Sequence, residues 1–512
     1  MNSKHFLRAV FAILSLVLAV PASAQCTGDV NNDGAVNGGD LGTLLSWWGP
    51  VVPANPVSVD SDLDGNCLIN GADLGLVLSN WGPCQSTITS ITPNQGCIVG
   101  GTQITITGTY LSSTSAVTVG GAPVTSFTVV NQNTVQAATP AGAEGPANVG
   151  VTTAAGTITA SQQFTYMPAS VSAIVPNVGG IAGGTQLTIS GDYLALTTGV
   201  TIGGTACTSL TIVSPTTLTA IVPAGTPGNA DVVITGGKGT IIVPGGYRYV
   251  SIVVPSWATL VEAQPDPTVV SDPFLFQAIA ATGLAWRIRD TASGMPMVLV
   301  PPGTFLMGAA ESDPQAGADE RPQHSVTISR AFYLGQHEVT QAQWVAKMRS
   351  NPSYFQGGNY PGWENRPVEQ VSWNSIQEFL AVTDCRLPTE AEWEYGCRAG
   401  TVGVRYADPI DDIAWSFGNS GARSRFVGLL YPNQFGLYDM LGNVHECVAD
   451  SRMTYTSTSQ VDPFEPGDFR IHRGGSWLDY SSSVAHRASW RSDRYSDTDK
   501  WAHVGFRVAR NP

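Results

Sequence analysis

The sequence predicts a multidomain chain that contains a small α-helical pair of loop-and-helix repeats, two all-β sandwiches and a C-terminal mixed α+β domain. Three observations predict this organisation. One segment repeats without a gap at an offset of 33 residues, and a second segment repeats at an offset of 83 residues. Charge is distributed unevenly, since 19 of the 25 Lys and Arg residues lie beyond residue 296.

The N-terminus predicts export. Residues 1–24 carry Lys4 and Arg8, then an apolar run to about Val20, then Ala22-Ser-Ala24, which is the pattern of a signal peptide. No later segment approaches the roughly 18 apolar residues that a membrane span needs. We therefore expect a secreted or cell-surface protein with no membrane span in the mature chain.

Composition limits the partners and the covalent bonds. The formal net charge of −14 argues against a nucleic-acid partner, because a phosphate-binding face needs clustered cations. Eight cysteines in an exported chain suit disulfides, but the sequence leaves their pairing open.

Residues 25–85 contain the first repeat, and its acidic loops predict calcium binding. The segment holds seven Asp and no Glu, Lys or Arg. Oxygen-bearing side chains recur at loop positions 1, 3, 5, 9 and 12, which suits calcium, a hard cation that takes six to eight oxygen ligands. Each loop runs into a short apolar helix that ends at Gly-Pro. The candidate ligands are Asp29, Asn31, Asp33, Asn37 and Asp40 in the first loop, and Asp62, Asp64, Asn66, Asn70 and Asp73 in the second.

This pair resembles the dockerin domain, a duplicated calcium loop and helix that docks on cohesin-type receptors. The resemblance implies calcium as a cofactor and a cohesin-like or cell-envelope receptor as a partner of residues 25–85. Cys67 departs from the family pattern, because it replaces the turn glycine of the second loop. The alternative is an acidic linker, which the gapless duplication of ligands and helices disfavours. Since seven unneutralised carboxylates repel one another, we expect this segment to fold only with calcium.

Residues 86–167 and 168–250 form the second repeat, and both halves are predicted to be built of strands. Apolar positions alternate with Thr or Ser between Gly, Pro and Asn turns, which is typical of small antiparallel sandwiches. Gly100-Gly-Thr102 in the first half matches Gly183-Gly-Thr185 in the second. The pattern resembles the IPT/TIG immunoglobulin-like domains, which space or bind more often than they catalyse. Each half has no His and a single Cys, which leaves little chemistry to propose.

Residues 297–512 follow a predicted connector at 251–296 and carry a series of ordered motifs. Thr389 and Glu392 form a capping-box pattern that predicts the start of a helix. The domain is similar to the formylglycine-generating enzyme (sulfatase-modifying factor) family, whose fold is related to that of C-type lectins. The motifs that carry the resemblance are Glu320-Arg-Pro-Gln-His324, Arg386-Leu-Pro-Thr-Glu-Ala-Glu-Trp393, Leu437-Tyr-Asp-Met-Leu-Gly-Asn-Val-His-Glu446, Arg473-Gly-Gly-Ser-Trp477 and Val504-Gly-Phe-Arg507.

The family resemblance also implies a calcium site in this domain. In family members one ion is held by the residue after Leu-Tyr and by the Gly-Asn-Val-x-Glu turn. These positions fall on Asp439, the carbonyls of Gly442 and Val444, and Glu446. Two carboxylates and two carbonyls are a suitable ligand set for a hard cation. The alternative is that Glu446 caps the turn.

The same resemblance bears on copper. The formylglycine-generating oxidase binds copper(I) through two cysteines that follow Gly-Gly-Ser, and it uses oxygen to convert a substrate cysteine to formylglycine. Copper(I) requires soft thiolates. In this sequence the two cysteine positions fall on Asp479 and Val484, and the last cysteine of the chain is Cys447. We therefore predict that copper is not a cofactor and that the oxygen chemistry is absent.

Other candidates for chemistry lie in the same domain. Ser476, Asp479, His486 and Arg487 are predicted to line a polar cleft, where a Ser-His-Asp triad is a speculation that only geometry can test. All six His of the mature chain lie beyond residue 296, yet their spacings fit no local metal-ligand motif. The cysteines of the domain are expected to be buried or locally disulfide-bonded rather than catalytic; they are Cys385, Cys397 and Cys447.

Three hypotheses for the function follow. The missing cysteine pair favours an exported calcium-binding protein whose C-terminal domain binds a glycan or a protein at the cell surface, although fold analogy alone suggests the ligand class. The second hypothesis is a formylglycine-generating oxidoreductase, or a related enzyme activity in the same cleft. The third makes the chain a cell-envelope component anchored by residues 25–85.

Overall fold

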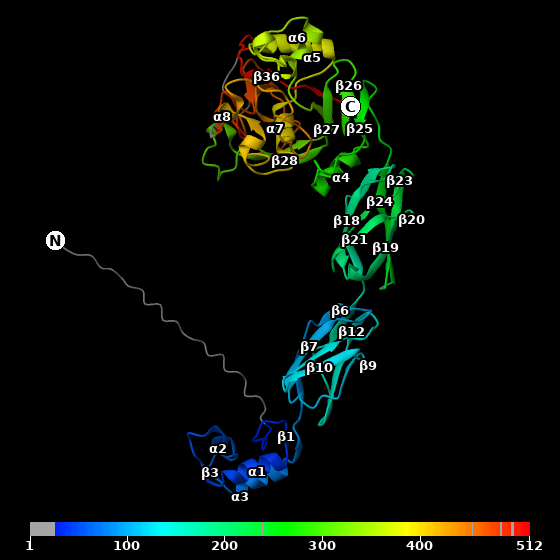
Figure 1. Cartoon of the computed structure of the whole chain (residues 1–512), viewed down its shortest axis with the longest axis vertical. Coiled ribbons are helices and arrows are strands. Elements are labelled where there is room, and N and C mark those ends of the chain that lie inside the picture. The colour runs from blue at the N-terminus through cyan, green and yellow to red at the C-terminus, as the bar shows by residue number, and fades with distance from the viewer. Residues whose placement is uncertain (1–25, 238, 453, 482–483, 493–495) are drawn as a thin grey trace, which may run out of the picture. The chain divides into compact units, whose positions relative to one another are not determined.

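A computed structural model describes residues 26–237, 239–452, 454–481, 484–492 and 496–512 (Figure 1). The predicted signal peptide, residues 1–24, lies outside the described residues. The chain divides into two compact units, the first ending at Ser170 and the second running from Val171 to Pro512. Within the described residues, no helix combines the length and the apolar character that crossing a bilayer requires.

The acidic repeats form two equivalent helices that pack against each other (Figure 1). Helix α1 (Gly38–Ser46) begins after Asn37, and α3 (Gly71–Ser79) begins after Asn70, so the ninth loop position is the N-cap in both repeats. A short helix, α2 (Pro56–Asp60), lies between the repeats in the sequence. Two-residue strands tie the repeats together; β1 (Ala35–Val36) pairs with β4 (Gly82–Pro83), and β2 (Gly49–Pro50) pairs with β3 (Leu68–Ile69).

A disulfide joins the two ends of this segment. Cys26 and Cys84 are 58 residues apart in the sequence, and their Cα atoms lie 5.6 Å apart. The bond lies at the edge of a small core that includes Val36, Leu44 and Val77. The other six cysteines of the chain are free.

The two halves of the second repeat are β-sandwiches, as predicted. The first contains β5 (Thr87–Thr92), β6 (Gln95–Cys97), β7 (Gln103–Thr109), β8 (Ala116–Val119), β9 (Ala122–Pro123), β10 (Ser126–Asn131), β11 (Thr134–Ala138), β12 (Gly145–Ala147), β13 (Val149–Thr153), β14 (Gly156–Thr159) and β15 (Phe164–Met167), in sheets ordered β10-β11-β7-β5, β14-β13-β8-β9 and β12-β15-β6. The second contains β16 (Ser170–Val175), β17 (Val178–Gly180), β18 (Gln186–Asp192), β19 (Thr197–Ile202), β20 (Thr205–Ala206), β21 (Thr208–Ser214), β22 (Thr217–Ile221), β23 (Gly228–Gly236) and β24 (Gly239–Val250), in sheets ordered β16-β18-β22-β21 and β17-β24-β23-β19-β20.

One repeated glycine has the same steric reason in both sandwiches. Gly100 and Gly183 have φ values of +76° and +73°. A Cβ atom would lie 2.4 Å from the backbone of Pro140 in the first case and 2.5 Å from that of Pro223 in the second. Any side chain would therefore clash at either position, which explains why the glycine recurs.

The predicted connector at 251–296 contributes elements to the C-terminal domain. Strands β25 (Ala258–Glu262) and β26 (Arg287–Asp290) extend the domain's main sheet, ordered β25-β26-β27-β30-β37. Helix α4 (Pro273–Ala281) is capped by Asp272. The buried core of the domain also includes Val178 and Val250 of the second sandwich. These residues therefore form a packed joint between the sandwich and the domain.

The C-terminal domain combines three main helices with short strands, as a mixed α+β fold. Its helix α7 (Glu390–Arg398) begins after Thr389, whose hydroxyl accepts the N–H of Glu392 at 3.1 Å, so the predicted capping box is confirmed. Helices α5 (Gln341–Met348) and α6 (Trp373–Thr383) pack together (Figure 1). The remaining main elements are β27 (Pro296–Val300), β28 (Gly303–Met307), β29 (His324–Ile328), β30 (Phe332–Gly335), β31 (Ala414–Trp415), α8 (Phe417–Ser420), β32 (Leu441–Gly442), β33 (His445–Ser451), β34 (Gln460–Val461), β35 (Arg470–Arg473), β36 (Val504–Phe506) and β37 (Ala509–Arg510).

Candidate functional site

The loop after β35 places Asp479 in a network of three hydrogen bonds. The hydroxyl and the backbone N–H of Ser476 donate to Asp479 Oδ2 at 2.8 and 3.0 Å, and Nε2 of His445 lies 3.1 Å from the same oxygen. Burial by itself raises the pKa of Asp479, but the hydrogen bonds and charge of His445 and the Ser476 hydroxyl outweigh it and lower the pKa to about 2. Asp479 is therefore an ionised carboxylate at neutral pH.

These contacts do not assemble a Ser-His-Asp triad. The Ser476 hydroxyl donates to Asp479 and accepts the N–H of Leu478 at 3.3 Å. Nε2 of His486 lies 3.3 Å from the backbone carbonyl of Ser476, not from its hydroxyl. Ser476 is also fully buried. The Ser476 hydroxyl therefore donates its proton in a hydrogen bond to a weakly basic carboxylate. The His486 imidazole, which would be the base of a triad, contacts the backbone carbonyl of Ser476 instead.

Arg487 and His486 are placed inside the domain, away from a solvent-facing cleft. Arg487 forms buried ion pairs with Asp313, at 2.9 Å, and with Glu320. His486 is fully buried. Arg487 was predicted to line a polar cleft, but a buried guanidinium with two carboxylate partners has a structural role. Of the four predicted cleft residues, only Asp479 is partly exposed, with 27% of its side chain accessible.

Exposed apolar side chains surround Asp479 and form, with it, what we call the Asp479 patch. The aromatic rings of Phe417 and Tyr480 lie 4.8 Å apart, and the Phe417 N–H donates to the carbonyl of Asp479 at 2.8 Å. Leu478 and Tyr480 are exposed on either side of Asp479 in the sequence, and Phe417 is also exposed. Our sequence reasoning missed these residues, although their signal was present as apolar positions flanking a polar loop residue.

Three histidines gather near this patch through strand pairing rather than sequence spacing. Strand β33 lies between β35 and β36, which brings His445 close to His472 and His503. The ring centroids of His445 and His503 are 5.6 Å apart. Burial first, and then the charge of His445, lowers the pKa of His503 to about 4. In the described part of the chain, the sets of three acidic, His or Cys side chains whose ligand atoms converge lie elsewhere, in the acidic repeats.

The two carboxylates implied as calcium ligands in the C-terminal domain both have hydrogen-bond partners. Both oxygens of Glu446 accept hydrogen bonds from Arg507 at 2.6 Å, and one of them also accepts the Trp393 indole N–H at 2.7 Å. Asp439 accepts the N–H of Gly428 at 2.6 Å through Oδ2, whereas its Oδ1 has no partner. Glu446 pairs with an arginine, Asp439 keeps one oxygen without a hydrogen-bond partner, and calcium binding at these residues stays a prediction.

The acidic repeats fit calcium better. One carboxylate oxygen from each of Asp29, Asp33 and Asp40 lies within 4.8 Å of the others, and Asp62, Asp64 and Asp73 converge in the same way. The fold of the loops is also repeated. Asp29 accepts the N–H groups of Asp33 and Gly34, and Asp62 accepts those of Asn66 and Cys67. Three converging carboxylates in each loop suit a hard divalent cation.

The remaining predicted ligands of these loops have local roles. The side-chain oxygens of Asn37 and Asn70 accept N–H groups at 2.7 Å as helix caps. Asn31 donates to Asp33, and Asn66 donates to Asp64. Cys67, at the turn where the first loop has glycine, has a φ of +66°. A left-handed conformation costs a non-glycine residue about 1–2 kcal/mol, and each loop has one such residue, because Asn32 of the first loop has a φ of +56°.

Removing calcium is expected to unfold the acidic repeats, because the three clustered carboxylates in each loop then repel one another. We expect hydrogen–deuterium exchange of residues 26–84 in the full mature chain to accelerate when a chelator is added. Peptides from the two sandwiches serve as the internal control and should exchange at unchanged rates. Exchange of residues 26–84 that is insensitive to the chelator would contradict the calcium assignment.

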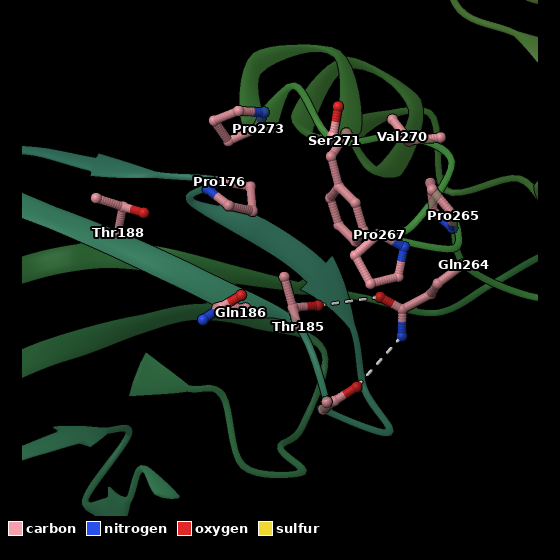
Figure 2. A pocket seen from close by; sticks show the side chains of 13 residues that line it. Pro176, Thr185, Gln186, Thr188, Gln264, Pro265, Pro267, Val270, Ser271 and Pro273 are labelled. Carbon is pink, nitrogen blue, oxygen red and sulfur yellow. Dashed lines mark hydrogen bonds between the residues drawn. The ribbon is translucent and has the colours of Figure 1, made fainter. Parts of the chain in front are cut away.

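A separate cleft lies between the second sandwich and residues 264–276, which belong to the predicted connector (Figure 2). Its volume is about 380 Å³. The amide of Gln264 braces one wall, since it accepts the Thr185 hydroxyl at 3.2 Å and donates to the Gly183 carbonyl at 3.4 Å. Prolines form much of the remaining wall, and every residue that lines the cleft is uncharged. The cleft therefore offers shape and hydrogen bonds, but no group for acid–base chemistry.

Comparison with known proteins identifies the domains. The family described as "Sulfatase-modifying factor enzyme 1-like domain" matches residues 284–512, and the "IPT/TIG domain" family matches residues 86–166 and 169–250. The chain carries a C-terminal sulfatase-modifying factor domain. Two IPT/TIG domains precede it, so both predicted resemblances are confirmed.

Known relatives each match less than half of this chain. The "Formylglycine-generating enzyme" of Streptomyces coelicolor is 28% identical over 315 residues, which cover 49% of this chain and 96% of that protein. The "Serine/threonine-protein kinase pkn1" of Chlamydia pneumoniae is 30% identical over 244 residues, so this chain spans only 38% of that protein's length. The solved structure of "Treponema denticola variable protein 1" is 26% identical, with a TM-score of 0.39, over 43% of this chain and 95% of that chain.

The thiols of the sulfatase-modifying factor domain are poorly suited to metal binding or nucleophilic attack. Burial raises the pKa of Cys385 to about 11, that of Cys397 to about 12 and that of Cys447 above the range of ordinary thiols. Cys385 lines an open groove of about 600 Å³, whereas Cys397 and Cys447 are buried, as predicted. Cys385 and Cys397 do not form a disulfide with each other. Val484, at the second copper position of the family, has only an aliphatic side chain to offer.

Proposed function

We propose that this chain is an exported, calcium-binding surface protein whose sulfatase-modifying factor domain binds a glycan or protein ligand without copper-dependent oxidase chemistry. The observation that carries the proposal is the state of Asp479. It stands where the oxidase family has its first copper cysteine, and it is an ionised oxygen ligand held by Ser476 and His445. Copper(I) prefers two soft thiolates, and this pair of positions offers a hard carboxylate and a valine.

Two further observations support export and binding. The disulfide between Cys26 and Cys84 suits an oxidising compartment, because cytosolic reductants would keep both thiols reduced. In the Asp479 patch, Phe417 and Tyr480 present exposed rings beside a carboxylate. Aromatic faces with a nearby hydrogen-bond acceptor suit a sugar ring or a peptide side chain. The acidic repeats then act as the calcium-dependent attachment to a cohesin-like or cell-envelope receptor.

An oxidase assay tests the first part of the proposal. The full mature chain is loaded with copper(I) in air and incubated with a peptide that carries a Cys-x-Pro-x-Arg motif, and the peptide is followed by mass spectrometry. We expect its thiol to survive unchanged, while the Streptomyces coelicolor formylglycine-generating enzyme converts it under the same conditions. Loss of the thiol with gain of an aldehyde would overturn the proposal and establish the alternative, a formylglycine-generating oxidoreductase.

A direct binding assay tests the second part. The mature chain is applied to immobilised glycans and to envelope extracts, and any captured partner is tested against Tyr480→Ala. We expect this substitution in the Asp479 patch to weaken binding at least tenfold. Phe274→Ala, which removes an equally exposed ring from α4, is the matched control and should leave binding unchanged. Equal affinities of the two variants and the parent chain would place the ligand elsewhere.

A further inference from the structure

Arg366 is a nearly buried cation whose contacts carry no full negative charge. Its exposed fraction is 5%. Its guanidinium donates to the backbone carbonyl of Ser424 and lies over the rings of Tyr360 and Phe426, at 5.9 and 5.1 Å from their centroids. A buried charge is normally paired with an opposite one, because removing it from water is costly. A carbonyl and two rings do not neutralise Arg366.

Two further arginines lie beside Arg366, and we call the three residues the arginine cluster. Arg423 and Arg425 flank Ser424 in the sequence, so the hydrogen bond from Arg366 to Ser424 brings three cations together. Both flanking arginines are partly exposed, and the guanidinium of Arg425 lies 4.9 Å from the ring centroid of Trp415. Burial first, and then the charges of Arg423 and Arg425, lowers the pKa of Arg366. The three positive charges therefore act on one another.

No carboxylate balances the arginine cluster. Across the residues that the structure describes, every ion pair involves other cations. Glu369 is the acidic group that acts on Arg366, but its two oxygens accept the N–H groups of Tyr354 and Phe355 at 2.9 Å. Burial also raises the pKa of Glu369 to about 7, so this group is only partly ionised at neutral pH. The cluster thus lacks a fixed counter-ion.

The hydrogen-bond groups left without partners around the cluster are donors. They are Nε of Arg366, Nε of Arg423, the hydroxyl of Ser424 and the indole N–H of Trp415. Guanidinium and indole nitrogens only donate, and a hydroxyl can do so. Buried donors without acceptors are costly. Uncompensated positive charge together with unused donors indicates a ligand that is negatively charged and rich in acceptor oxygens.

We propose that Arg366, Arg423 and Arg425 bind a tetrahedral oxyanion, which is a sulfate or a phosphate group. Guanidinium groups match such anions through paired hydrogen bonds, and a tetrahedral group has enough oxygens to serve several donors at once. The partial exposure of Arg423 and Arg425 allows the group to be a free ion or an ester on a glycan. The inference goes beyond the proposed function, because ligand binding at the Asp479 patch requires no anionic group.

Hydrogen exchange of the full mature chain tests this site. Sodium sulfate and sodium phosphate are titrated separately, with sodium chloride at matched ionic strength as the reference, and exchange is followed in peptides that contain Arg366 and Arg423. If the anion must leave before these segments open, an anion at ten times its Kd slows their exchange about tenfold. We expect sulfate or phosphate to produce this protection. Equal exchange in all three salts would overturn the proposal.

Variants of the partly exposed Arg423 test the cluster without disturbing the buried Arg366. We expect Arg423→Gln to weaken the anion response at least tenfold, and Arg423→Lys to restore part of it, because lysine keeps the charge but lacks the guanidinium fork. Arg330→Gln is the matched control, since it removes an exposed arginine of the same domain, and should respond like the parent. An Arg423→Gln chain that also responds like the parent would overturn the assignment.

Heparin and chemically desulfated heparin distinguish the two sources of the anion. Protection by heparin at a tenfold lower sulfate concentration than inorganic sulfate, and none by the desulfated form, would assign the site to an ester on a glycan. Equal affinity per sulfate group would assign it to the free ion. Peptides from residues 26–84 report separately whether the added anions withdraw calcium from the acidic repeats. The Tyr480→Ala assay tests the Asp479 patch independently, so failure of one proposal leaves the other measurable.

Discussion

Replacing Arg473 with methionine is expected to destabilise the sulfatase-modifying factor domain by about 3 kcal/mol, the low end of the usual cost of breaking a buried ion pair, because Glu394 keeps a second partner in Arg398. The Arg473 side chain is fully buried, and its guanidinium pairs with the fully buried Glu394. It also donates to the carbonyls of Ala488 and Ser489, at 2.8 and 2.9 Å, and to that of Trp490. Methionine fills part of the volume but satisfies none of these acceptors.

The loss can be measured by guanidinium unfolding of the full chain, followed by tryptophan fluorescence. Ten of the 13 tryptophans lie beyond residue 250 and none lies in the two IPT/TIG domains, so the signal reports mainly the C-terminal domain. Arg287→Met is the matched control, because Arg287 pairs with Glu262 at the surface, with side chains 27% and 39% exposed. A surface pair contributes about 1 kcal/mol or less. Equal midpoints for the two variants would refute the structural role of Arg473.

Breaking the Cys26–Cys84 disulfide should cost the acidic repeats about 4 kcal/mol, as expected for a loop of this length. This loss is large compared with the stability that the segment can gain from packing, because its buried apolar core consists of only a few side chains. We expect the Cys26→Ser, Cys84→Ser double variant to be cleaved by protease within residues 26–84 even when calcium is present.

Cys67→Ser is the control for that experiment, since Cys67 is a free and exposed cysteine of the same segment. Its protease resistance with calcium should match that of the parent chain. Resistance of the double variant equal to that of the Cys67 variant would mean that calcium alone holds the repeats together, and that the disulfide is dispensable.

Local patterns predicted most of the architecture. The two gapless repeats and the capping box at Thr389 depend on residues that are near one another in the sequence, so their geometry follows from spacing. The helix caps Asn37 and Asn70 fall at the repeated ninth loop positions for the same reason. The predicted connector was the main departure, because the short strands of residues 251–296 are held by the sheet of the terminal domain rather than by their own pattern.

Long-range pairing determined what the sequence could not reveal. Glu446 and Arg507 are 61 residues apart, and Arg487 is 174 residues from Asp313, so neither pair has a local signal. The predictions that Glu446 is a ligand and that Arg487 lines a cleft depended on these side chains being free. Arg507 pairs with Glu446, whereas Asp313 and Glu320 pair with Arg487, and only the packed structure shows these partners. The sequence also did not indicate which of the seven other cysteines pairs with Cys26.

The joint between the second IPT/TIG domain and the sulfatase-modifying factor domain has a consequence for how such proteins are assembled in evolution. Val178 and Val250 of the sandwich belong to the core of the terminal domain, and the side chains of Gln264 and Gln277 accept backbone N–H groups of the sandwich at 3.1 and 3.0 Å. A recombination breakpoint at residue 250 would expose apolar side chains on both products and leave these glutamines without their partners. The exchangeable cassette is therefore the sandwich together with the terminal domain, and we expect genomes that shuffle this module to inherit the two as one piece.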